Sequence, residues 1–195
     1  MPELKCLLGM PFRGQQWVLK LLAGGVITLI PLVNIMSLGY FVHCINSGQR
    51  GRRCLPEWWD WQDYIRQGCT MLLIILIYLV AAALIVWLAM CIPVAGTLLS
   101  TLLFLVIILV IPMALANYAL HYVFQDGLMI VDIIRMTARV AGVYATAFLL
   151  ALLIVSIAWA LLLAFPVLGL LSGLIIFYTG IIYSYILGSL HREAL

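Results

Sequence analysis

Three long stretches of this chain contain no charged residue, and their lengths limit the folds available to it. Residues 21–49, 67–125 and 140–191 hold no Asp, Glu, Lys or Arg. One membrane-spanning helix needs about 20 consecutive apolar residues. The second and third stretches are long enough for two spans each, and the first is about half as long. The pattern therefore predicts two transmembrane hairpins preceded by a shorter membrane segment.

The composition excludes a water-soluble protein. Of 195 residues, 67% are hydrophobic and 9% are charged, with a mean hydropathy of +1.23. Soluble domains are about half apolar and a quarter charged. The apolar runs are continuous, without the two-residue alternation of a β-barrel strand. We therefore expect an all-α, polytopic membrane protein that forms one domain over residues 1–195.

Short Pro-containing motifs predict where the chain turns. "IPVAG" and "FPVLG" lie midway along the second and third uncharged stretches, and "IPLVN" lies within the first. Proline ends a helix, and a small or polar residue three positions later suits the start of the next one. We expect hairpins at 69–122 and 141–190, with spans near 69–91, 97–122, 141–164 and 169–190. Pro31 then marks a third hairpin tip, and Asn34 is predicted to cap the second helix of that hairpin.

The first segment has two interpretations, a re-entrant hairpin over 17–46 or a single span kinked at Pro31. In the re-entrant form every Lys and Arg of the chain lies on one side of the membrane. A single crossing instead places Lys5, Arg13 and Lys20 on the opposite side, against the tendency of cationic residues to stay cytoplasmic. The charge distribution favours the hairpin, whereas the tolerance of proline in membrane helices keeps the kinked span open.

The polar segment "GRRCLPEWWDWQDYIRQG" predicts an interfacial helix over residues 55–66. Tryptophan prefers the headgroup level, and nearby arginines attract anionic lipids. The predicted headgroup contacts are Arg50, Arg52, Arg53, Trp58 and Trp61. A metal or acid–base site built on Glu57, Asp60 and Asp63 is the alternative to a solvated acidic face. Residues 125–139 form a second polar segment, predicted to be an amphipathic connection between the two hairpins.

Histidine and cysteine carry little evidence of a cofactor. His43, His121 and His191 all fall near the charged side, where two of them could ligate a haem or a metal. Interfacial histidines are the simpler interpretation, with Asn117 and His121 forming a local hydrogen bond or a link between helices. No Cys-x-x-Cys motif occurs. We expect no cofactor, no metal and no catalytic residue.

The last predicted span carries a stripe of small residues, which allow the close approach of helix backbones in lipid. Its members are Gly169, Gly173, Gly180, Ser184 and Gly188. The partner could be a helix of the same chain or of a second copy. Packing within the chain is favoured because adjacent hairpins must contact each other.

The first third of the chain resembles a known family. The pattern is Gly-Gly, Pro-x-x-Asn, Gly-Tyr and Leu-Pro-Glu-Trp-x-x-Trp, here formed by Gly24, Gly25, Pro31, Asn34, Gly39, Tyr40, Leu55, Pro56, Glu57, Trp58 and Trp61. It is similar to the uncharacterised prokaryotic integral membrane family that is number four thousand and thirteen among the domains of unknown function. The resemblance implies a bacterial or archaeal inner-membrane protein and no known activity.

The expected function is non-enzymatic. The four predicted spans hold no ionisable residue except His121 near one end, which disfavours ion-coupled transport. We expect a scaffold, a membrane-organising protein or an assembly factor that contacts lipids, with its charged face in the cytoplasm. The alternative is a passive channel or a transporter of lipids or small molecules that uses the discontinuous first hairpin. Expected partners are membrane lipids and either another membrane protein or a second copy, not nucleic acid.

Overall fold

The computed structural model describes residues 17–30, 33–52, 55–57, 60–90 and 96–195. Three residues of the predicted sites, Pro31, Arg53 and Trp58, lie outside these ranges. Within the described residues every regular element is a helix, as the sequence predicts. The protein is therefore an all-helical membrane protein.

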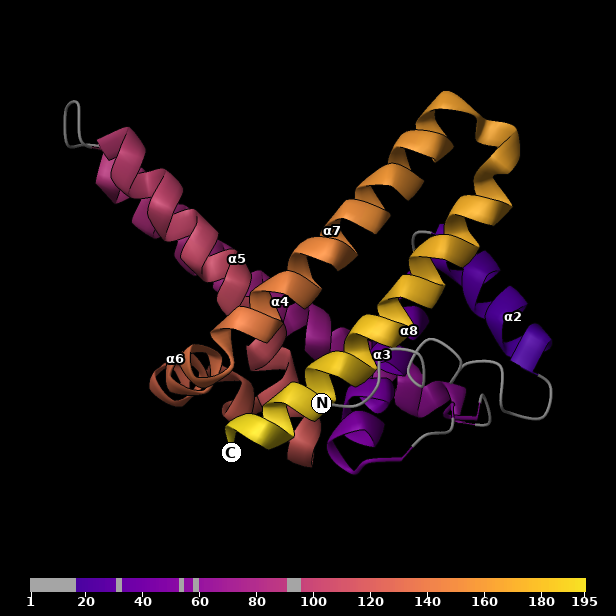
Figure 1. Cartoon of the computed structure of the whole chain (residues 1–195), viewed down its shortest axis with the longest axis horizontal. Coiled ribbons are helices and arrows are strands. Elements are labelled where there is room, and N and C mark those ends of the chain that lie inside the picture. The colour runs from indigo at the N-terminus through magenta and orange to yellow at the C-terminus, as the bar shows by residue number, and fades with distance from the viewer. Residues whose placement is uncertain (1–16, 31–32, 53–54, 58–59, 91–95) are drawn as a thin grey trace.

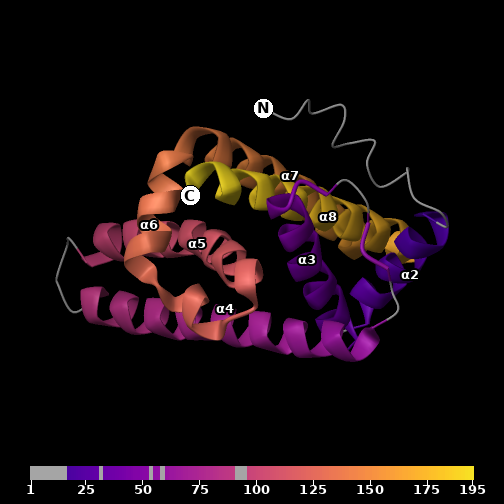
Figure 2. The same ribbon diagram turned by 90° about the horizontal axis from the view of Figure 1, so that it is seen from below.

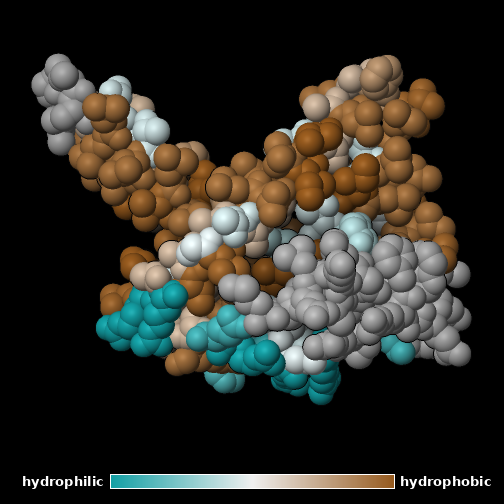
Figure 3. Space-filling model, viewed as in Figure 1, coloured by the Kyte–Doolittle hydropathy of each residue, from teal (hydrophilic) through white to brown (hydrophobic). Residues whose placement is uncertain are grey.

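Four long helices form two arms, each a pair of antiparallel helices. The first arm consists of α4 (Trp61–Met90) and α5 (Gly96–His121), and the second of α7 (Ala141–Ala164) and α8 (Gly169–Ala194). All four are long and apolar enough to cross a membrane. Figure 1 shows the arms diverging in a V from a common base. In Figure 3, hydrophilic residues gather at that base while the arms are apolar, so the base is the charged side of the molecule.

Helix α3 (Asn34–Gln49) joins the two arms. It packs against α4, α5 and α8, and Figure 2 shows it crossing between α4 and α8. Glycines make both crossings close: Gly39 meets the Tyr64 carbonyl of α4, and Gly188 of α8 meets the Ile45 carbonyl of α3. A Cβ at either glycine would lie within 2.2 Å of those carbonyl oxygens. The small residues thus allow backbone contact without intervening side chains.

Helix α2 (Trp17–Leu29) runs antiparallel to α3. Along α8, Leu29 of α2 lies beside Gly173 and Gly24 lies beside Phe177, so the residue numbers of the two helices run in opposite directions. Helix α3 instead runs parallel to α8. Phe41 lies beside Gly180, and Ile45 further along α3 contacts Gly188 further along α8. Hydroxyls of Thr28 and Ser37 meet at 3.2 Å across the pair. The first segment therefore has the geometry of a helical hairpin.

The predicted cap at Asn34 is wrong. This residue is the first residue of α3, and Val33 occupies the cap position in a right-handed helical conformation without a side-chain cap. The Asn34 amide donates to the Ile30 carbonyl at 2.8 Å, and the Met36 amide donates to the Val33 carbonyl at 2.9 Å. Backbone carbonyls of the preceding turn thus replace the side-chain acceptor. Like Asn34, the equivalent glycines Gly96 and Gly169 are the first residues of their helices.

The interfacial helix predicted over 55–66 is also not a separate element. Residues 55–57 and Asp60 are non-helical, and residues 61–66 form the first turns of α4. Tyr64 is only 4% exposed, and its hydroxyl donates to the Glu57 carbonyl at 2.5 Å. Contact of this turn with α3 holds it in line with the rest of α4.

The connection between the arms is amphipathic. It comprises a short 3₁₀ helix, η2 (Phe124–Leu128), and α6 (Ile130–Arg139). Ile133 is buried, whereas Val131 is 70% exposed and Ile134 is 48% exposed. Asp132 and Arg135 approach to 3.7 Å on the polar face. Helix α6 therefore presents both apolar and charged side chains at the base of the molecule.

Candidate functional site

Buried polar side chains from three helices meet at the charged base. His191 of α8 is fully buried between Gln49 of α3 and Asn117 of α5. Its Nδ1 lies 3.1 Å from the Gln49 amide nitrogen, and its Nε2 lies 3.2 Å from the Asn117 carbonyl oxygen. An amide nitrogen only donates and an amide oxygen only accepts, so the arrangement requires the neutral ring with its proton on Nε2. This histidine connects both arms to α3.

Two side chains of α3 hold the last turns of α5. Asn46 donates to the Ala119 carbonyl at 2.6 Å, and Gln49 donates to the Ala116 carbonyl at the same distance. Asn117 completes the connection by donating to the Asp126 carbonyl of η2 at 2.6 Å. Asn117 thus links helices through His191 rather than bonding locally to His121, which lies 3.2 Å from the Asp126 carboxylate. These bonds fix the depth of α3 between the arms.

A second polar cluster lies between α3 and α4. His43 Nε2 lies 2.9 Å from an oxygen of Asp63, within ion-pair distance, and His43 Nδ1 lies 3.4 Å from the Tyr122 hydroxyl. Gln67 donates to the other Asp63 oxygen at 3.2 Å and accepts a hydrogen bond from Tyr118. Asp63 therefore has two side-chain neighbours, His43 of α3 and Gln67 of its own helix.

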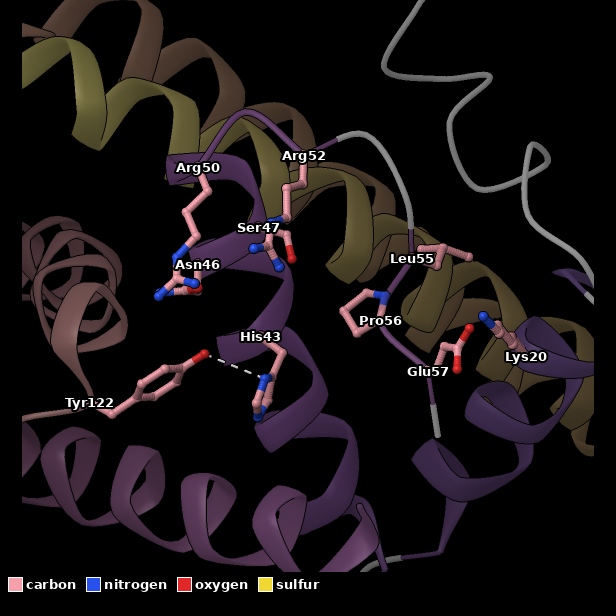
Figure 4. A pocket seen from close by; sticks show the side chains of 10 residues that line it. All are labelled: Lys20, His43, Asn46, Ser47, Arg50, Arg52, Leu55, Pro56, Glu57 and Tyr122. Atoms are coloured by element: carbon pink, nitrogen blue, oxygen red, sulfur yellow. Dashed lines mark hydrogen bonds between the residues drawn. The ribbon is translucent and has the colours of Figure 1, made fainter. Parts of the chain in front are cut away.

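A cavity of about 550 Å³ opens beside this cluster. Among the described residues, three cationic side chains line it, Lys20 from α2 and Arg50 and Arg52 from the end of α3, together with the carboxylate of Glu57. In Figure 4 the two arginines point from the end of α3 toward Asn46 and Ser47, and Glu57 lies opposite Lys20. Leu55, Pro56 and the ring of Tyr122 add apolar wall. We call this cavity the basic pocket.

Tyr122 separates the basic pocket from a second cavity of about 380 Å³, which is lined by Asp63, Arg66 and Gln67 among others. Its backbone has φ 59°, the left-handed region that a residue with a Cβ rarely adopts. Such conformations cost energy and gather at sites where the surrounding structure imposes them. Burial raises the pKa of the Tyr122 phenol to about 12, so the hydroxyl is neutral and adds no negative charge to the pocket.

The structure places some of the predicted site residues in this region. Arg50 and Arg52 line the basic pocket, whereas Trp61 is 56% exposed at the start of α4. Asn34 lies at the other end of α3, beside the turn of the first hairpin. No sequence pattern marks Lys20 or Tyr122 as site residues, because only the packing of α2 and α5 around α3 brings them to the two arginines. A signal did exist for Asn46 and Gln49, two polar residues one turn apart in an apolar segment.

The small-residue stripe faces α2 and α3. Gly173 contacts Gly25 and Leu29, and Gly180 contacts the ring of Phe41. Gly188 meets α3, Ser184 is buried, and Gly169 lies beside Leu162 of α7. The partners of the stripe are thus helices of the same chain.

Residues that could ligate a metal do not converge in the described part of the chain. No group of three His, Cys, Asp or Glu side chains that could hold an ion occurs there. The three histidines lie in separate environments, beside Asp63, Asp126 and Gln49 respectively. The polar groups of the base are arranged to hold helices together and to line cavities.

The sequence of the chain also identifies its family. A family model described as "Protein of unknown function (DUF4013)" matches residues 23–167, about three quarters of the chain. The chain belongs to the DUF4013 family. No curated protein and no solved structure matches it. The DUF4013 match includes α3, Glu57 and Tyr122, while Lys20 and His191 lie outside the matched residues.

Proposed function

We propose that this DUF4013 protein is a non-enzymatic integral membrane protein that organises the surrounding lipid by occupying more area in one leaflet than in the other. The observation that carries the proposal is that more helices lie at one end of the molecule than at the other. Among the described residues, the charged base contains α2, α3 and α6 in addition to the four long helices, and the opposite end contains the tips of the two arms (Figure 1).

The first hairpin accounts for most of this asymmetry. Helices α2 and α3 have 13 and 16 residues. At 1.5 Å per residue they extend about 20 and 24 Å, less than the hydrocarbon core of about 30 Å. The two helices run antiparallel to each other and both pack on α8, which supports a segment that enters the membrane from the charged side and returns to it. The hairpin then displaces lipid mainly from the leaflet next to the base.

Helix α6 adds to the same leaflet. Its exposed Val131 and Ile134 would insert among acyl chains while Asp132 and Arg135 remain at the headgroup level. The cationic residues described in the structure, including Arg50, Arg66 and Arg192, gather at the base, which by the positive-inside tendency faces the cytoplasm. The proposed location is the inner membrane of a prokaryotic cell.

The re-entrant hairpin predicts the sidedness of single cysteines introduced after the native cysteines are replaced. Lys20→Cys, near the start of α2, and Gln62→Cys, beyond the end of α3, should react with an impermeant thiol reagent from the same side of the membrane. Leu98→Cys, 77% exposed in the first turn of α5, should react only from the opposite side. Labelling of Lys20→Cys and Gln62→Cys from opposite sides would show a single crossing instead.

The leaflet asymmetry predicts sorting by membrane curvature. In giant vesicles with pulled tubes, an impermeant fluorophore on Gln62→Cys marks only molecules whose base faces outward, and one on Leu98→Cys marks only the opposite orientation. Molecules with the base outward should be enriched on the tube relative to the vesicle, because the outer leaflet of a tube is expanded. Molecules of the opposite orientation should be depleted. Equal densities on tube and vesicle in both orientations would refute the proposal.

A passive channel or a transporter of lipids or small molecules is the second candidate. The feature that favours it is the pair of polar cavities on either side of Tyr122, next to the discontinuous first hairpin. Rapid exchange of labelled lipid between leaflets of the same vesicles, without curvature sorting, would support this candidate over the first.

A further inference from the structure

We propose that the basic pocket binds the phosphate group of an anionic phospholipid, with Arg50 and Arg52 as its ligands and Lys20 as a third cation. The inference rests on the proposed function in one respect, which is that the base of the molecule lies at the headgroup level. It goes beyond that function by assigning a defined lipid site and the chemistry of its ligand.

The charge of the pocket selects an anion. Three cations and one carboxylate line it, which leaves an excess of two positive charges. The nearby Asp63 is not among the residues that line this pocket; it lines the second cavity, where it accepts a hydrogen bond from Gln67. Tyr122 contributes a neutral hydroxyl. A free anion of suitable size would therefore find an uncompensated cationic site.

The geometry of the arginine side chains favours a phosphate as the anion. A guanidinium presents a planar set of N–H donors that matches two oxygens of one phosphate. Arg50 and Arg52 project from the same end of α3 into the same cavity (Figure 4). Ser47 lines the cavity beside them and offers a hydroxyl to the same ligand. Two arginines and a hydroxyl on one side of a cavity suit a tetrahedral oxyanion better than a single carboxylate.

The apolar residues that line the rest of the pocket favour a lipid over a soluble anion. Leu55, Pro56 and the ring of Tyr122 line the cavity alongside the charged groups, so the pocket is amphipathic. Its volume of about 550 Å³ exceeds the space that one phosphate fills and falls within the range of small-molecule sites, about 300–1,000 Å³. Basic pockets between helices at the cytoplasmic side of membrane proteins are suited to phospholipid headgroups. An anionic glycerophospholipid satisfies both the charged and the apolar parts of this cavity.

The test measures lipid binding to the full chain in detergent by native mass spectrometry, with phosphatidylglycerol as the probe and phosphatidylcholine as the uncharged reference. The wild-type protein should retain phosphatidylglycerol preferentially. The double variant Arg50→Gln/Arg52→Gln should bind it about tenfold more weakly or worse, since each cation contributes about 1 kcal/mol near a surface. The double variant Arg135→Gln/Arg139→Gln removes the same charge from exposed positions of α6 outside both cavities and should bind like the wild type.

A second variant keeps the test valid if the arginine changes lower the yield of folded protein. Glu57→Gln removes the one carboxylate of the pocket and should strengthen phosphatidylglycerol binding. The Tyr64 hydroxyl contacts the backbone carbonyl of Glu57, so the side-chain change leaves that bond in place. Unchanged binding in Glu57→Gln, or equal weakening in the two double variants, would overturn the proposal.

Soluble competitors distinguish the source of the phosphate. Inorganic phosphate and glycerol 3-phosphate should fail to displace the lipid at concentrations equal to it. Complete displacement by either would overturn the lipid assignment in favour of a soluble anion. The measurement uses detergent micelles and no curved membrane, so its failure is distinct from a failure of curvature sorting.

Discussion

Gly39→Ala should lower the free energy of unfolding by about 3 kcal/mol or more, or prevent recovery of folded protein. The added Cβ would lie 1.9 Å from the Tyr64 carbonyl oxygen of α4. The obstacle is backbone, so no rotamer change relieves it, and α3 must move away from α4. The reciprocal contact, Gly68 against the Ile35 carbonyl at 2.0 Å, predicts a similar loss for Gly68→Ala. Unfolding by a denaturing detergent, followed by circular dichroism, measures both.

Gly142→Ala is the matched control. This glycine lies in the first turn of α7, and a Cβ built on it has no atom within 4 Å. Alanine favours a helix by up to about 1 kcal/mol relative to glycine, so the variant should be as stable as the wild type or slightly more stable. Equal losses in Gly39→Ala and Gly142→Ala would show that α3 and α4 do not approach as closely as the structure has them.

His191→Leu should lower the free energy of unfolding by about 2 kcal/mol or more. Leucine removes the ring from both neighbours: the Asn117 carbonyl oxygen loses its bond to Nε2, and the Gln49 amide nitrogen keeps only its bond to the Ala116 carbonyl. Both groups are buried, and an unpaired buried amide costs about 1–3 kcal/mol. The same unfolding measurement applies.

The control for His191 is His121→Leu. The His121 side chain is 64% exposed and contacts only the Asp126 carboxylate among its recorded partners, so its loss should change stability by about 0.5 kcal/mol or less. The double variant Gln49→Leu/His191→Leu should cost less than the sum of its single changes, since each single change already removes the hydrogen bond that the two side chains share. Additive losses would mean that the two side chains do not interact.

The spans could be predicted closely because their positions follow from lengths alone. Two spans must share each long uncharged stretch, and the predicted starts at 141 and 169 agree with those of α7 and α8. The predicted span begins at residue 69, whereas α4 begins at Trp61, and the reason for this difference lies in the packing. Residues 61–68 are amphipathic enough for a surface helix, and only the contacts of Tyr64 and Gly68 with α3 join them to the span.

The candidate site was predicted in part. Arg50 and Arg52 stand out in the sequence because they end an uncharged stretch beside a tryptophan-rich segment. Lys20 and Tyr122 line the basic pocket together with the two arginines, and they lie 30 and 72 positions from Arg50 in the sequence. No local pattern relates positions so far apart. Their meeting depends on how α2 and α5 cross α3, which the periodicity of each helix alone does not determine.

The central position of α3 has a consequence for the order in which the protein is made. Helix α3 leaves the ribosome early, yet its polar partners come late: Asn46 bonds to Ala119 and Leu120, and Gln49 bonds to His191, 142 positions further on. Until α5 and α8 have been inserted, Asn46 and Gln49 must be held by water or by a chaperone. The two arms can form as independent hairpins during synthesis, but they become one structure only when the last turn of α8 arrives.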